Sequence, residues 1–276
     1  MSTQFDASKF TTPQAKPLPV VLMLDTSGSM THAVDPSDSN SVSKIATLND
    51  AVGKMLRTLS KEELQTNEFL ISVITFGGIA NEASLVFGPA PASAFTFKNF
   101  SADGGTPLGA AIGIAKKLIE NRQLIPSRAY RPLVILVSDG LPTDDWVTTF
   151  EDFIQNERSA KCDRMALGIG PETTSGEGRQ ILERFVDGTN HAVFEAKDAE
   201  EIYKFFKFVT MSVVTRSHSQ DPNAIPIDAT LKPPPKQKTL NDDKLQPTPV
   251  GSPAENINSD KSGSQPAQPD DEDSYW

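Results

Sequence analysis

Four short apolar runs, each followed by an aspartate or a glycine, constrain the fold of this chain more than any other feature of its sequence. They are rich in Val, Ile and Leu and cover residues 18–24, 69–76, 133–138 and 165–169. Continuous apolar runs of this length are typical of strands that are buried on both faces of a sheet. Residues 83–88 form a weaker strand candidate, which we expect at an edge of the sheet.

Between the strand candidates lie stretches in which apolar residues recur every three to four positions. These stretches predict amphipathic helices at about residues 44–59, 108–119, 145–159, 177–187 and 199–214. A short strand candidate at 192–194 separates the last two helices. Strands that alternate with helices are joined by right-handed crossovers into a mainly parallel sheet. We therefore expect an α/β fold: a doubly wound, mainly parallel sheet with helices on both faces and one antiparallel edge strand.

The two ends of the chain differ from this pattern. Residues 1–16 are mostly polar, and residues 217–276 hold 10 of the 21 prolines and 10 acidic side chains against 5 Lys. These two segments contain too few apolar residues for their burial to offset the conformational entropy that is lost on folding. The sequence predicts a disordered N-terminal arm at 1–16, one globular domain at 17–215, and a disordered Pro-rich acidic tail at 216–276.

The net charge of −10 narrows the classes of partner, because nucleic acids and anionic lipids require clustered Lys and Arg. We expect neither nucleic acid nor membrane as a partner. No run approaches the ~20 apolar residues that a membrane-spanning helix needs. The single cysteine, Cys162, excludes a disulfide within the chain. Together with the polar N-terminus, these features lead us to expect a cytoplasmic protein.

Polar oxygens gather where the predicted strands end. Asp25, Ser27 and Ser29 follow the first strand at alternate positions, Thr106 ends a Gly-Gly-Thr turn before a helix, and Asp139 follows the strand 133–138. Ligands of open parallel sheets lie beyond these carboxyl ends. Two carboxylates and three hydroxyls, without nitrogen or sulfur, favour a hard cation. The sequence predicts one divalent metal site, with Mg²⁺ as the expected ion and Mn²⁺ or Ca²⁺ as alternatives.

Five such donors leave an octahedral shell incomplete once some of them act through water. An oxygen from a partner's Asp or Glu could complete the shell, with the charge of the metal supplying the attraction. We therefore expect a protein partner that offers an acidic side chain.

The residues Asp25-Thr26-Ser27-Gly28-Ser29, with Thr106 and Asp139 following in that order, resemble the metal-ion-dependent adhesion site of von Willebrand factor A domains. The likeness extends over residues 17–210 in the order of strands and helices. Within that family the chain most resembles the bacterial TerY-type proteins, in residues 22–30, 71–76 and 131–145. The loop after Met30 and the tail after 216 depart from the TerY-type pattern.

This resemblance implies a metal-dependent protein-binding module without enzyme activity. It implies that Ser27 and Ser29 bind the metal directly, that Thr106 binds it directly or through water, and that Asp139 acts through water. For the TerY-type group it further implies a role in tellurite resistance or stress, with a Ser/Thr kinase or a protein phosphatase as partner.

Two other functions use the same residues. Asp25 could act in a metal-dependent phosphoester hydrolase of the haloacid dehalogenase type, but the second aspartate of that motif is replaced by Ser27. The metal could also be purely structural. Local roles are further alternatives: Thr106 as the N-cap of a helix begun by Pro107, and Asp144 and Asp145 as caps of the next helix.

Overall fold

The computed structural model describes residues 16–63, 69–155, 157–219 and 223 of the chain. Its strands are β1 (Leu18–Thr26), β2 (Phe69–Gly77), β3 (Glu82–Ala90), β4 (Leu133–Ser138), β5 (Asp163–Ile169) and β6 (Val193–Ala196). Its α-helices are α1 (Lys44–Glu63), α2 (Leu108–Glu120), α3 (Trp146–Gln155), α4 (Gly176–Val186) and α5 (Ala199–Ser217). Short 3₁₀ helices are η2 (Gly28–Thr31), η3 (Ala92–Ala94), η4 (Ser159–Lys161) and η5 (Pro171–Thr173).

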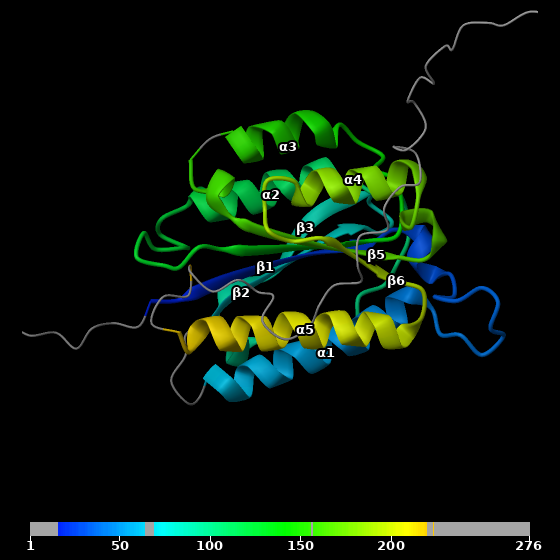
Figure 1. Cartoon of the computed structure of the whole chain (residues 1–276), viewed down its shortest axis with the longest axis horizontal. Helices are drawn as coiled ribbons and strands as arrows, with labels where there is room; N and C mark the ends of the chain where they lie inside the picture. The colour runs from blue at the N-terminus through cyan, green and yellow to red at the C-terminus, as the bar shows by residue number, and fades with distance from the viewer. Residues whose placement is uncertain (1–15, 64–68, 156, 220–222, 224–276) are drawn as a thin grey trace, which may run out of the picture. The chain divides into compact units, whose positions relative to one another are not determined.

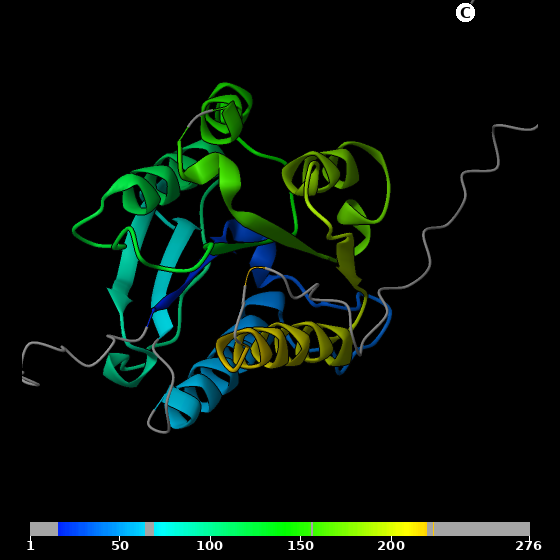
Figure 2. The same cartoon turned by 60° about the vertical axis from the view of Figure 1, so that its left-hand side comes forward.

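The six strands form one sheet in the order β3-β2-β1-β4-β5-β6. All neighbouring strands are parallel except β2 and β3, so the predicted antiparallel edge strand is present. Helices α1 and α5 cover one face of the sheet, and α2, α3 and α4 cover the other, as both views show (Figures 1 and 2). The predicted doubly wound α/β fold is confirmed.

The central strand β1 shows why both faces need helices. All nine of its residues are buried, and successive side chains alternate between the two faces. Leu22 and Leu24 join the apolar cluster that contains α1 and α5. Val21 and Met23 join the cluster that contains α2, α3 and α4. A strand with both faces buried must be apolar throughout, which explains the continuous run that marked it in the sequence.

The strand order reverses between β1 and β4, because the chain moves from β1 to β2 on one side and from β4 to β5 on the other. In open α/β sheets the ligand crevice lies at such a switch point, beyond the carboxyl ends of the strands. The connection from β1 to α1, which follows η2, also projects from this edge, at the right-hand end of the sheet in Figure 1. The topology therefore places the functional edge next to β1 and β4.

Some element boundaries differ from the predicted ones. The helix expected at 145–159 ends at Gln155, and a separate 3₁₀ turn, η4, follows it. Helix α5 continues to Ser217, beyond the expected end at 214. Within the described part of the chain, no helix has both the length and the apolarity that a bilayer crossing requires. Residues 1–15 of the predicted arm and residues 220–222 and 224–276 of the predicted tail lie outside the described residues.

Candidate metal-binding site

The carboxylates of Asp25 and Asp139 come together because β1 and β4 are adjacent parallel strands. Asp25 is the next-to-last residue of β1, and Asp139 directly follows β4. Asp25 is fully buried, and both of its oxygens accept hydrogen bonds. Oδ1 accepts from the backbone N–H of Ser27 at 2.8 Å, and Oδ2 accepts from the hydroxyl of Ser138 at 2.6 Å. These bonds hold the Asp25 carboxylate in one orientation.

The two serines of the first motif connect the carboxylates. The hydroxyl oxygens of Ser27 and Ser29 lie 3.0 Å apart. The Ser29 hydroxyl donates to Oδ1 of Asp139 at 2.7 Å. A hydroxyl that donates its hydrogen to a carboxylate keeps its lone pairs for another group. Ser29 therefore has an oxygen that can accept a cation while its hydrogen stays bonded to Asp139.

Thr106 lies on the other side of a small gap. Its hydroxyl and that of Ser29 face the same point beside Gly140, since a β-carbon placed on Gly140 would lie 3.6 Å from the Ser29 hydroxyl oxygen and 3.9 Å from that of Thr106. The absence of a side chain at Gly140 thus leaves open space between these two hydroxyls. Thr143 fixes the Thr106 backbone, since its hydroxyl accepts from the Thr106 N–H at 3.0 Å and its own N–H donates to the Thr106 carbonyl at 2.9 Å.

The backbone at the end of β1 holds the surrounding turns in place. The carbonyl oxygen of Thr26 accepts from the N–H groups of Gly78 and Asp103 at 3.1 and 3.0 Å, and the N–H of Gly28 donates to the Gly104 carbonyl at 2.9 Å. Gly104 has a φ of +69°, and a β-carbon there would lie 2.1 Å from the Gly78 carbonyl oxygen. Only glycine fits this position, so the Gly-Gly-Thr turn depends on it.

The environment of Asp25 opposes its negative charge. Burial, and secondly the nearby charge of Asp139, raises the pKa of Asp25 from 3.8 to about 6. The hydrogen bonds from Ser138 and Ser27 act in the opposite direction without cancelling this effect. A bound cation would supply the missing positive charge, because an opposite charge within a few ångströms favours the ionised form.

One positive side chain already lies at the site. The Lys44 ammonium, at the start of α1, donates to Oδ2 of Asp139 at 2.8 Å and lies 3.7 Å from Oε2 of Glu172. The side chains of Lys44 and Asp139 are 3% and 0% exposed, so the ion pair is shielded from solvent. Lys44 therefore neutralises one of the two carboxylates and fixes its orientation.

The donor set fits a hard divalent cation. Asp25, Ser27, Ser29, Thr106 and Asp139 all lie at the same edge of the sheet, and Ser27, Ser29 and Asp139 are linked by hydrogen bonds. The half-buried Ser29 opens the cluster to solvent. Among the described residues, no group of three or more His, Cys, Asp or Glu is arranged around one point. The oxygen-only donors, two carboxylates and three hydroxyls, suit Mg²⁺ or Mn²⁺ better than zinc or copper.

The structure corrects two local expectations. Helix α2 begins at Leu108 after Pro107, and its first turn is not capped by Thr106. The carboxylate of Asp144 accepts instead from the N–H groups of Gly109 and Ala110, both at 2.9 Å. Asp144 therefore caps α2 and not the following helix, because the β4–α3 loop crosses the start of α2. The hydroxyl of Thr106 therefore does not act as the N-cap of α2.

Asp145 caps α3 as expected, accepting from the Thr148 N–H at 3.2 Å.

Sequence reasoning missed Ser138 and Lys44. A polar residue at the end of the apolar run 133–138 was a signal for Ser138. Lys44 carried no such signal, since its partner Asp139 lies 95 residues away in the chain.

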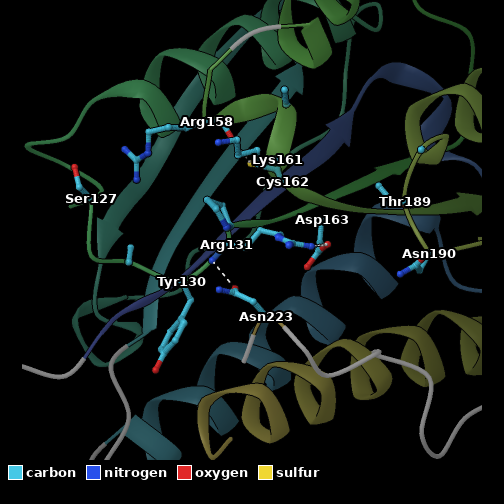
Figure 3. A pocket seen from close by; sticks show the side chains of 14 residues that line it. Ser127, Tyr130, Arg131, Arg158, Lys161, Cys162, Asp163, Thr189, Asn190 and Asn223 are labelled. Atoms are coloured by element: carbon cyan, nitrogen blue, oxygen red, sulfur yellow. Dashed lines mark hydrogen bonds and ion pairs between the residues drawn. The ribbon is translucent and has the colours of Figure 1, made fainter. Parts of the chain in front are cut away.

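A second polar hollow, of about 530 Å³, lies at the opposite edge of the sheet, where β4 and β5 begin (Figure 3). Its two arginines are engaged within the chain. Arg158 donates to the carbonyls of Ile119, Ile125 and Pro126, and Arg131 pairs with Asp163 at 3.4 Å. We therefore regard the β1–β4 edge as the stronger candidate site.

Comparison with known families agrees with this fold. Residues 20–141 match the family model described as the von Willebrand factor type A domain. This stretch contains all five predicted metal ligands. The match and the fold together support a von Willebrand factor type A domain in this chain. No curated protein matches the sequence at a significant level.

Solved structures show the same fold at low sequence identity. The pilus adhesin SpaC of Lactobacillus rhamnosus GG matches with a TM-score of 0.56 and 14% identity, covering 74% of this chain and 31% of the adhesin. The PilB minor pilin of Streptococcus sanguinis matches at 0.54 and 13%, covering 75% of this chain and 64% of the pilin. A von Willebrand factor type A protein of Catenulispora acidiphila matches at 0.51 and 19%, covering 72% and 43%. The chain thus spans less than two thirds of each of these proteins.

Proposed function

We propose that this chain is a metal-dependent protein-binding module, which holds one divalent cation at the β1–β4 edge and uses it to bind an Asp or Glu of a partner. The observation that carries the proposal is the linked set of Ser27, Ser29 and Asp139 beside a fully buried Asp25. An oxygen-only set with two carboxylates, one of them already paired with Lys44, leaves a bound Mg²⁺ with residual positive charge. That charge is what would attract an anionic side chain.

The metal part of the proposal is tested by calorimetric titration of the full chain with Mg²⁺ and with Mn²⁺. Asp25→Ala and Ser29→Ala should abolish binding while circular dichroism shows an intact fold. Thr58→Ala is a matched control, because this exposed hydroxyl lies on α1 and donates to the Lys54 carbonyl at 3.0 Å. Unchanged affinity in the two site variants would refute the proposed ligands.

The binding part is tested by affinity capture of partners with Mg²⁺ and with a chelator. A partner that needs the cation is lost in chelator and is also lost with Ser29→Ala. Capture that persists in chelator would favour a purely structural metal.

The finer assignment rests on sequence resemblance alone. We propose that the module works in a bacterial stress or tellurite-resistance system in the cytoplasm, with a Ser/Thr kinase or a protein phosphatase as partner, because residues 22–30, 71–76 and 131–145 resemble TerY-type proteins. Direct binding assays with such a kinase and phosphatase, each in Mg²⁺ and in chelator, test this assignment.

The hydrolase alternative finds less support at the site. A nucleophilic Asp25 would need an accessible oxygen, but the residue is fully buried and both oxygens accept hydrogen bonds. A generic phosphoester in Mg²⁺ tests the alternative: turnover that disappears in Asp25→Ala would establish it.

A further inference from the structure

Three exposed aliphatic side chains lie on the loops around the candidate metal site. Within the described part of the chain eight large hydrophobic residues are exposed, among them Val42 (54%), Ile79 (91%) and Leu141 (47%). Single exposed hydrophobic residues are common on protein surfaces, whereas apolar surface rimmed by polar residues is typical of interaction sites.

Ile79 is tied to the metal site through its turn. Its neighbour Gly78 donates to the Asp103 carbonyl at 2.6 Å, and the side chain of Asn81 accepts from the Gly105 N–H at 3.0 Å. The turn at residues 78–81 is thereby held against the residues that precede Thr106. A side chain exposed to 91% at the tip of a fixed turn gains no packing within the described part of the chain.

Leu141 lies on a second loop that contacts the same Gly-Gly-Thr turn. It follows Gly140, the residue that faces the hydroxyls of Ser29 and Thr106. Two residues further on, Thr143 exchanges two hydrogen bonds with the Thr106 backbone. Ile79 and Leu141 therefore lie on the two loops that hold Thr106 in place.

Val42 belongs to the loop between η2 and α1. The bridge between Ala33 and Ser43 and the bond from the Val34 N–H to the Val42 carbonyl close this loop. It begins just after Ser29 and ends at Lys44, so both ends of the loop lie at the site. Figure 1 shows it projecting beyond the sheet.

The loop segments around the site contain acidic residues but no Lys or Arg. The segments that form this edge, which we name the rim, are residues 27–43, 77–81, 103–106, 139–145 and 170–175. They contain no Lys or Arg, and their acidic residues are Asp35, Asp38, Asp103, Asp139, Asp144, Asp145 and Glu172. Lys44, whose ammonium pairs with Asp139 at the site, is buried. A carboxylate that approaches the metal is therefore repelled by the acidic side chains of the rim.

We propose that the partner presents its Asp or Glu within a basic segment, with an aliphatic residue beside the carboxylate and Lys or Arg flanking it. This inference rests on the proposed function. Lys and Arg neutralise the acidic rim, which otherwise repels an anionic ligand. The aliphatic residue packs against Ile79 and Leu141 and removes their apolar surface from water.

The test uses a display library of random peptides selected on the immobilised full chain, once with Mg²⁺ and once with chelator. Three proteins are immobilised in turn: wild type, the rim double variant Ile79→Ser/Leu141→Ser, and the control double variant Leu124→Ser/Met211→Ser. The control removes two exposed side chains, 44% and 53%, outside the rim segments. Circular dichroism and Mg²⁺ calorimetry check that all three proteins fold and bind metal alike.

We expect Mg²⁺-dependent enrichment of peptides with one acidic residue, an aliphatic neighbour and flanking Lys or Arg. In the rim variant the aliphatic preference should fall about tenfold or more, the factor that burial of one aliphatic side chain supplies, while the acidic preference persists. The control variant should select as wild type does.

Two results overturn the inference, and they are distinguishable. Mg²⁺-dependent acidic peptides without aliphatic or basic neighbours would contradict the inference and leave the proposed function standing. If no acidic residue is enriched in a Mg²⁺-dependent way, the proposed function itself fails and the inference fails with it.

Discussion

Asp25 is the residue whose surroundings most oppose its own charge. Its pKa is about 6 in the folded chain and 3.8 when it is free of burial and of Asp139. Between these pH values the folded state holds a proton that the unfolded state releases. Stability in the absence of metal therefore falls as the pH rises from about 4 to about 6, by up to ~3 kcal/mol from this group alone.

The first prediction isolates this effect with Asp25→Asn. The amide does not titrate, so in chelator the variant should gain stability relative to wild type as the pH is raised from 4 to 7. Urea denaturation at several pH values measures the difference. Mg²⁺ should reverse it at neutral pH by stabilising wild type only. A difference between the two proteins that is independent of pH would contradict the assigned burial of an ionising Asp25.

Lys44 leads to a second prediction at the same scale. Its ammonium lies 2.8 Å from Asp139 and repels a cation at the site. Lys44→Met should therefore bind Mg²⁺ at least about tenfold more tightly, and in chelator it should be less stable by ~3 kcal/mol because Asp139 loses its buried partner. Calorimetry and denaturation with and without Mg²⁺ measure both effects.

Lys54→Met is the matched control for Lys44→Met, because Lys54 is 58% exposed and pairs with Asp50 on the surface of α1. It should leave Mg²⁺ affinity unchanged, as surface ion pairs contribute little. Equal Mg²⁺ affinities of Lys44→Met and wild type would show that the lysine does not act on the cation.

At the scale of elements, the start of α2 depends on a carboxylate from another loop. Asp144 accepts from the Gly109 and Ala110 N–H groups, so Asp144→Ala should lower the free energy of unfolding by about 1–2 kcal/mol. Asp144→Asn keeps one acceptor oxygen and should lose less. Denaturant titration compares the two variants, and equal losses would contradict the capping role.

The secondary-structure elements were easier to predict from the sequence than the contacts of the site residues. The strands were predictable because a strand with both faces buried is apolar throughout, as in residues 18–24 and 133–138. The meeting of Asp25 with Asp139 followed from a general rule of parallel sheets. Asp144 and Lys44 were not predictable, since each acts across a tertiary contact, 35 and 95 residues away in the chain. A local sequence pattern carries no information about contacts between residues so far apart in the chain.

At the scale of the whole molecule, metal binding and folding are linked. A cation that binds only the folded chain stabilises it by ~2.7 kcal/mol at a concentration a hundred times its dissociation constant. For a domain of this size that corresponds to roughly 5–11 °C in Tm. We expect Mg²⁺ to raise the Tm of wild type by this amount, chelator to remove the increase, and Ser29→Ala to show none. If Mg²⁺ leaves the Tm of wild type unchanged, the linkage between metal binding and folding is contradicted.

The acidic rim and the metal also act together at this scale. The net charge of −10 favours cations and basic partners, and the acidic residues of the rim add to that attraction at one edge of the sheet. Partner binding should therefore weaken with increasing salt even when Mg²⁺ is saturating.

The most direct test of the account is the anomalous diffraction of a crystal grown or soaked with Mn²⁺. We expect one strong anomalous peak at the β1–β4 edge, with the hydroxyl oxygens of Ser27 and Ser29 about 2.1 Å away, a distance typical of small hard divalent ions. A crystal that takes up Mn²⁺ only elsewhere, with this edge empty, would contradict the claim that these five residues hold a cation.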